Sequence, residues 1–152
     1  MRYFGYGSNL NEKDLKKWCD RKRRNVPKLL NPKIEKLENY AIGFTLRSIS
    51  RGGGVADIIA SEGDYCWGVV FDVTDEDLEI IDMKEGVKPD GTGAYKRLSL
   101  PDNMMTYVVV KKESDFVQPT NEYLDAIIEG AKNYGLPKEW IDKLESFKTK
   151  II

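Results

Sequence analysis

The sequence has 152 residues, and its 24 Lys and Arg nearly balance its 25 Asp and Glu, leaving a formal net charge of −1 at pH 7. Such a balance gives no overall attraction to nucleic acid or to an anionic membrane, and a chain of this length can bury a core without disulfides or metal. The sequence contains no histidine, which excludes Ser-His triads, Cys-His dyads and His-ligated metal sites.

The first segment predicts a short strand that runs into a turn and then a helix. Residues 2–6 are typical of a strand, and the helix is expected from Asn11 to about Arg21, with Asn11 and Asp14 as its capping box. The turn between them, residues 7–9, consists of small and polar residues. Such a turn leaves backbone N–H groups aimed in one direction, where they can hold an anion or a developing oxyanion.

The next segment predicts strands around a glycine-rich loop. Residues 33–46 indicate one or two strands, and residues 50–54, with three successive glycines, predict a mobile loop that either connects strands or covers a ligand. Residues 57–60 and 65–73 are expected to form a hairpin that turns at residues 62–64. Its second strand should place alternating residues in the core: Tyr65, Trp67, Val69, Phe71 and Val73.

The third segment predicts a short helix followed by two strands. Thr74 begins the helix as the first residue of a capping box, and Gly86 ends it in the position of a left-handed cap. A loop over residues 88–93 leads to strands at 94–100 and 104–110.

The last segment is predicted to be helical, and it completes the pattern from which we predict the fold class. Residues 123–131 carry apolar side chains at helical spacing, Gly135 ends that helix, and Pro137 begins a final one. Because helices and strands do not alternate strictly, we expect one α+β domain over residues 1–152. Its sheet should be small and mixed or mainly antiparallel, or an open barrel, with helices beside it.

Glu85 is the first candidate for chemistry because it lies in the last turn of a predicted helix, directly before Gly86. A carboxylate there meets the negative end of the helix dipole, at a cost of about 0.3–1 kcal/mol, and Ile81 and Val87 would add desolvation. Both effects would raise the pKa of Glu85, as a general base near neutral pH requires. A surface glutamate at a frayed helix end is the alternative, and position alone favours that alternative.

The cysteines and the chain ends carry no signal of their own. Cys19 and Cys66 match no metal or redox spacing, so we expect both to be buried. No apolar run approaches the roughly 20 residues of a membrane span, and the start of the chain lacks a signal-peptide pattern. We therefore expect a soluble, cytoplasmic protein.

Two motifs resemble the gamma-glutamylcyclotransferase-like family. The stretch Tyr3 to Leu10, Tyr-Phe-Gly-Tyr-Gly-Ser-Asn-Leu, resembles the family's signature loop, and Glu85-Gly86-Val87, followed by a glycine loop and Tyr95, is similar to its Glu-Gly-Val element. The Tyr-Gly-Ser-Asn form is similar to the glutathione-pathway branch rather than the gamma-glutamylamine branch. Further similarity, in order along nearly the whole chain, lies at Trp67–Val70, Tyr107, Tyr123, Gly130–Lys132 and Gly135–Pro137.

The resemblance implies a site made of one acid and a binding loop. Glu85 would be the catalytic acid/base, and the substrate-binding residues would be Tyr3, Phe4, Gly5, Tyr6, Gly7, Ser8, Tyr107 and Tyr123. For Tyr107 and for Tyr123, a place in the core with one polar end is about as expected as a role in substrate binding. Ser8 has no usual base to activate it and is expected to donate its N–H. The stretch from Lys88 to Tyr95 looks longer than in a typical member of the family, so the identity of the substrate's leaving group stays open.

The implied reaction is the cyclisation of a gamma-glutamyl amide or dipeptide to 5-oxoproline with release of the amine. Because the substrate's own α-amine is the nucleophile, the resemblance implies no metal and no cofactor. The expected partner is a small gamma-glutamyl molecule, with no nucleic acid and no membrane, and a homodimer is left open. Two alternatives remain: removal of a gamma-glutamyl group from a dedicated amine or biosynthetic intermediate, and non-catalytic binding of a small acidic metabolite.

Overall fold

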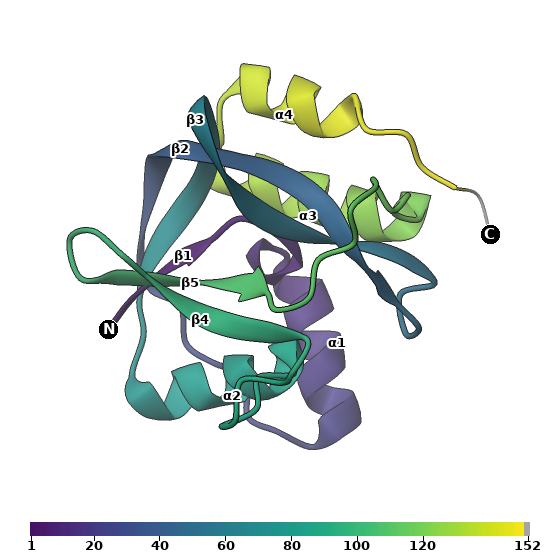
Figure 1. The fold of residues 1–152 in the computed structure, drawn as a ribbon. Helices are drawn as coiled ribbons and strands as arrows, with labels where there is room; N and C mark the ends of the chain where they lie inside the picture. The colour runs from purple at the N-terminus through teal and green to yellow at the C-terminus, as the bar shows by residue number, and fades with distance from the viewer. Residues whose placement is uncertain (151–152) are drawn as a thin grey trace.

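The computed structural model describes residues 1–150 as a mixed sheet flanked by helices (Figure 1). This arrangement confirms the predicted α+β class. The elements in chain order are β1 (Arg2–Gly5), the 3₁₀ helix η1 (Ser8–Leu10), α1 (Glu12–Lys22), β2 (Leu30–Ser48), β3 (Gly53–Asp72), α2 (Asp75–Glu85), β4 (Tyr95–Leu100), β5 (Met104–Val109), α3 (Asn121–Tyr134) and α4 (Lys138–Glu145).

The sheet is open and places the first strand at its centre. Its five strands lie in the order β2-β3-β1-β5-β4. The central strand β1 is antiparallel to β3 and parallel to β5, whereas β4 and β5 form an antiparallel pair. The chain that leaves β1 therefore emerges from the middle of the sheet, between two neighbouring strands, and turns there into η1.

The predicted hairpin over residues 57–73 is wrong, because both of its segments belong to the single strand β3. That strand pairs with β2 along almost its whole length, from Leu30↔Asp72 to Ser48↔Gly53. Near Gly63 the register shifts, and the Gly63 N–H donates to the Asn39 side-chain oxygen at 3.1 Å. Gly63 has a φ of +87°. The extra residues form a bulge opposite Asn39 and do not reverse the chain.

The glycine-rich loop predicted at residues 50–54 is a tight turn between β2 and β3. The Gly52 N–H closes it by donating to the Ser48 carbonyl at 2.9 Å. The last two residues of the predicted loop, Gly53 and Gly54, already belong to β3. This turn carries Arg51 toward the N-terminal loop, and that position matters for the site.

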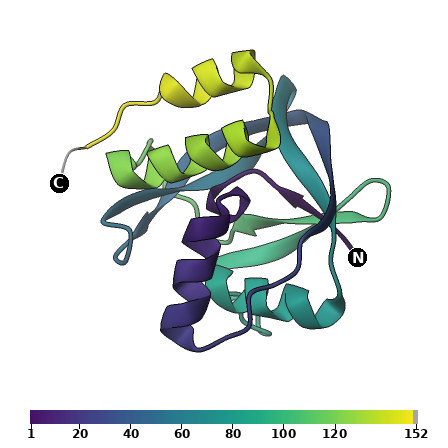
Figure 2. The ribbon, with the colours of Figure 1, turned by 180° about the vertical axis from the view of Figure 1, so that it is seen from behind.

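The helix boundaries agree with the capping signals of the sequence. The side chains of Asn11 and Thr74 accept hydrogen bonds from the backbone N–H groups three residues later, at 3.0 and 3.1 Å. Gly86 ends α2 in the left-handed region with a φ of +68°. Figure 2 shows α4 lying along α3, and α3 also packs against η1, the 3₁₀ turn that follows β1. No helix within residues 1–150 is long and apolar enough to cross a membrane.

The core lies on both sides of the sheet around β1 and the C-terminal half of β3. Phe71 and Val69 are buried as the alternation predicted, but Tyr65 is 38% exposed. Cys66, on the opposite face of the same strand, is fully buried, as is Cys19. Where β3 pairs with β1, at residues 69–72, side chains on both of its faces are buried, so Val70 is buried there as well as Val69 and Phe71. Tyr65 lies before that stretch.

Candidate active site

The loop after β1 folds into a 3₁₀ turn that fixes three polar or small residues next to the sheet. The Leu10 N–H donates to the Gly7 carbonyl at 3.1 Å, and the Asn11 N–H donates to the Ser8 carbonyl at 2.9 Å. The first N–H groups of a helix have no acceptor inside it. Those of Ser8 and Asn9 are therefore available to a ligand. Ser8 and Asn9 are both buried, so a bound group would lose its water there.

This loop and Glu85 border the same cavity. The cavity begins at the end of β1 and is closed by the last turn of α2 and by aromatic residues of β4, β5 and α3. Its lining residues are Tyr3, Tyr6, Gly7, Ser8, Asn9, Ala56, Glu85, Tyr95, Thr106, Tyr107 and Tyr123. Asn9 and Glu85 lie 76 residues apart in the sequence, and their side chains form a hydrogen bond. The structure thus brings the two motifs together.

Glu85 is held by a single side chain of the loop. The Asn9 amide nitrogen donates to the Glu85 Oε1 at 2.7 Å and also to the Tyr3 hydroxyl at 3.0 Å. Burial of the carboxyl group raises the pKa of Glu85, although the ammonium of Lys84, the Asn9 amide and Arg51 partly oppose that change. The sequence predicted the direction of this shift, and desolvation, one of the two causes expected for it, is its largest cause.

Most of the predicted binding residues lie at the cavity, but Phe4 and Gly5 do not line it. Side chains alternate along a strand, so Phe4 points away from the side that Tyr3 occupies. Its ring is fully buried in the core, in register with Val70 of β3. Gly5 lies against Leu10 and Phe71, where a side chain would have little room. The structure places Phe4 and Gly5 in the packing behind the cavity, and their contact with substrate stays a prediction.

The cavity tyrosines differ in what their hydroxyl groups can offer a ligand. The Tyr6 hydroxyl donates to the Tyr107 carbonyl at 2.7 Å, and the Tyr107 hydroxyl donates to the Asp82 carboxylate at 2.6 Å. The Tyr123 hydroxyl accepts the Ala56 N–H at 3.0 Å and keeps its own proton for another acceptor. Tyr123 is both a buried core residue and part of the cavity wall, so the two interpretations of its position hold together.

Asn9, Tyr95 and Thr106 also line the cavity, although none of their side chains was predicted to bind substrate. The Tyr95 hydroxyl donates to the Ala56 carbonyl at 2.5 Å, and the Thr106 hydroxyl donates to the Phe4 carbonyl at 2.7 Å. The first bond ties β4 to β3, which is not its neighbour in the sheet, and the second ties β5 to the neighbouring β1. Asn9 could have been identified from the sequence, because it belongs to the signature loop and its side-chain amide can donate and accept hydrogen bonds at once.

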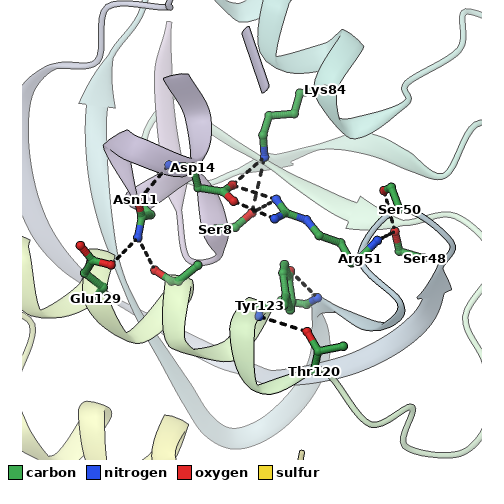
Figure 3. A network of polar contacts seen from close by, with 12 residues as sticks. Ser8, Asn11, Asp14, Ser48, Ser50, Arg51, Lys84, Thr120, Tyr123 and Glu129 are labelled. Atoms are coloured by element: carbon green, nitrogen blue, oxygen red, sulfur yellow. Dashed lines mark hydrogen bonds and ion pairs between the residues drawn. The ribbon is translucent and has the colours of Figure 1, made fainter. Parts of the chain in front are cut away.

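A cluster of charged side chains lies directly behind Ser8 (Figure 3). Arg51 makes two hydrogen bonds to the Asp14 carboxylate, at 2.7 and 2.8 Å. The Lys84 ammonium lies 3.6 Å from the same carboxylate. Both cations also approach the Ser8 hydroxyl oxygen at 3.5 Å. Within residues 1–150 no group of three His, Cys, Asp or Glu side chains is placed to hold a metal ion.

Comparisons with known proteins show what the sequence and the fold are similar to. A family model described as the AIG2-like family matches residues 65–144. The gamma-glutamylcyclotransferase of Bos taurus is 30% identical over 158 aligned residues, covering 96% of this chain and 78% of the relative, and that of Mus musculus is 28% identical with the same coverage. A solved gamma-glutamyl cyclotransferase structure has a TM-score of 0.75 at 26% identity, covering 99% of this chain and 89% of that one. The chain therefore belongs to the AIG2-like gamma-glutamylcyclotransferase family.

Proposed function

We propose that the protein cyclises a gamma-glutamyl amide or dipeptide to 5-oxoproline and releases the amine. The observation that carries this proposal is the half-buried Glu85 side chain, whose carboxyl group is held at 2.7 Å by Asn9 of the binding loop inside one shared cavity. The names of the similar proteins support the same reaction class. Hydroxyl, amide and carboxyl groups line this cavity, so it fits a small zwitterionic molecule better than a long apolar one.

The chemistry needs one base and one site for negative charge. The substrate's α-ammonium loses a proton to Glu85, and the resulting amine attacks the γ-carbonyl carbon. A carbon–nitrogen bond closes the five-membered ring, and the bond to the leaving nitrogen breaks as Glu85 returns a proton to it. The second proton of the former ammonium also ends on the leaving amine through solvent, so atoms and charge balance and no water is consumed. General acid–base help of this kind contributes about 10²–10⁴-fold.

The loop supplies the rest of the proposed site. The N–H groups of Ser8 and Asn9 would hold the carbonyl oxygen as negative charge develops, or the α-carboxylate. Asn9 Oδ1 is buried and has no hydrogen-bond partner within residues 1–150. Because both Asn9 N–H donors already serve Glu85 and Tyr3, this oxygen is a free acceptor. It would receive the substrate's ammonium, which leaves that group next to the base.

A substrate panel tests the proposal. The protein is incubated separately with gamma-glutamyl dipeptides, gamma-glutamylamines and glutathione, and 5-oxoproline is measured by mass spectrometry. We expect turnover of dipeptides or glutathione, with the amine half released in equal amount. Turnover of gamma-glutamylamines alone would support the dedicated-amine alternative. Binding of a panel member by calorimetry without any 5-oxoproline would support the non-catalytic alternative and contradict the proposal.

Asn9→Asp is expected to lower kcat/KM at pH 7 by about 100-fold and to move the acidic limb of the pH profile upward. The substitution keeps the shape of the side chain but places a second carboxyl against Glu85, in place of an amide donor now at 2.7 Å. Two carboxyl groups so close share a proton, so Glu85 stays protonated to higher pH.

The measurement for Asn9→Asp is the pH dependence of kcat/KM between pH 5 and 9, with Asn133→Asp on the exposed side of α3 as the matched control. The control should follow the parent profile. An Asn9→Asp profile whose acidic limb coincides with that of the parent would show that Asn9 does not contact the working base.

A further inference from the structure

The proposed reaction gives no role to Lys84, a cation whose side chain is only 5% exposed. Lys84 precedes Glu85 in the last turn of α2. Its ammonium lies 3.6 Å from the Asp14 carboxylate and 3.5 Å from the Ser8 hydroxyl. Withdrawing an ammonium group from water is costly unless it is paired. A surface lysine would serve the helix dipole equally well, so burial at this place needs another reason.

Arg51 completes the same arrangement from the opposite side (Figure 3). It reaches from the β2–β3 turn, lies 5.1 Å from the centre of the Tyr123 ring, and holds Asp14 through two hydrogen bonds. Hydrogen bonds from Arg51 and the charge of Lys84 keep the pKa of Asp14 below its usual value despite burial. Asp14 is therefore ionised, and it is one carboxylate placed between two cations.

The charges balance only when Glu85 is ionised. The charged groups that act on Glu85 within residues 1–150 are Lys84, Arg51 and Asp14. Burial lowers the pKa of Lys84, and the carboxylates of Glu85 and Asp14 oppose that change. With Lys84 charged and Glu85 protonated, the three groups carry a net positive charge; with Glu85 ionised as well, two cations face two carboxylates. The other titratable groups around Glu85 are phenols whose burial keeps them neutral, namely Tyr3, Tyr6, Tyr95 and Tyr123.

We propose that Lys84 is a positioning residue that keeps Glu85 ionised in the empty cavity and, through Ser8 and Asp14, fixes the binding loop beside it. This inference rests on the proposed function, in which Glu85 is the base. Burial and the charge of Lys84 have opposite effects on the pKa of Glu85. Burial raises that pKa and makes Glu85 a stronger base, and Lys84 keeps the pKa low enough for Glu85 to be ionised at neutral pH.

The test measures the ionisation of Glu85 directly. Protein labelled with ¹³C at the Glu carboxyl carbons is titrated by NMR, and the Glu85 signal is identified by its loss in Glu85→Gln. In Lys84→Gln, which keeps a donor for Ser8 but removes the charge, we expect the titration midpoint to rise by about one pH unit or more. In Asp14→Asn, which removes the competing carboxylate, we expect the midpoint to fall.

Kinetics give a second readout, because a purely structural role would not move a pH profile. The acidic limb of kcat/KM should rise with the NMR midpoint in Lys84→Gln, so that activity falls about tenfold below both midpoints and recovers at high pH. Lys84→Arg keeps the charge and should restore the parent midpoint. Lys132→Gln, an exposed position on α3, is the matched control and should change neither quantity.

The outcomes separate this inference from the proposed function. A Lys84→Gln midpoint that coincides with the parent value overturns the inference, as does a rise of the same size in Lys132→Gln. A midpoint that rises in Lys84→Gln and returns in Lys84→Arg supports it, and the NMR titration needs no turnover. A parent protein that forms no 5-oxoproline contradicts the proposed function, while the shifted midpoint still establishes the charge relation.

Discussion

Glu85→Gln is expected to reduce 5-oxoproline formation by about 10²–10⁴-fold while leaving substrate binding nearly intact. Glutamine keeps the size of the side chain and an oxygen that can accept from the Asn9 amide, now at 2.7 Å from Glu85 Oε1. It cannot accept the proton of the substrate's ammonium. The measurement compares kcat by mass spectrometry with the dissociation constant from calorimetry, for the substrate that the parent protein turns over best.

The stability of Glu85→Gln is the control for this experiment, and its sign follows from the pKa. Burial raises the pKa of Glu85 in the folded protein above its unfolded value. The folded state therefore binds this proton more tightly, and the parent protein loses stability as pH rises from the unfolded pKa through the folded one. The variant lacks this loss, so its melting temperature should equal or exceed that of the parent at pH 8.

Two results would contradict the role of Glu85. One is a Glu85→Gln protein with parent-like kcat at every pH. The other is a variant whose loss of activity is matched by a lower melting temperature at pH 8, because the activity would then follow folding rather than proton transfer.

Gly130→Ala is expected to destabilise the protein by about 1–3 kcal/mol and to lower activity as well. At an exposed helix position this change would stabilise by about 1 kcal/mol. Here an added Cβ would lie 2.6 Å from the Leu10 carbonyl carbon and 2.8 Å from the Asn11 nitrogen. Since those atoms are backbone, α3 or the segment that follows Asn9 has to move.

The measurement for Gly130→Ala combines urea unfolding with kcat/KM. Asn133→Ala, exposed on the same helix, is the matched control and should be neutral or slightly stabilising. A Gly130→Ala protein that is more stable than the parent would show that α3 does not pack tightly against the binding loop.

The sequence predicted well the features that depend on neighbouring residues. Asn11, Thr74 and Gly86 act through bonds and dihedral angles within one helical turn, so their signals can be read without the fold. The hairpin was wrong for the opposite reason. Whether Gly63 reverses the chain or forms a bulge depends on Asn39, which lies across the ribbon on β2.

In the candidate site, too, the sequence predicted what depends on adjacent residues and missed what depends on the fold. Glu85 and the binding loop could be identified because each stands in a motif of adjacent residues. The position of Phe4 away from the cavity lining could not be foreseen, because neighbouring strand residues face opposite sides and the motif does not say on which side the cavity lies. From the sequence, Asp14 had only a place in a capping box and Arg51 only a place in the glycine-rich loop, and no motif pointed to Lys84. Only the fold places three separate elements, α1, the β2–β3 turn and α2, around Ser8.

The most direct test of the proposed cyclisation follows the atoms of the substrate. A gamma-glutamyl dipeptide labelled with ¹⁵N at the α-amine is turned over in H₂¹⁸O, and the products are analysed by mass spectrometry. Attack by the substrate's own amine predicts 5-oxoproline that retains ¹⁵N and contains no ¹⁸O, together with an unlabelled released amine. Glutamate that carries ¹⁸O would mean that water is the nucleophile, and it would contradict the mechanism assigned to Glu85 and the binding loop.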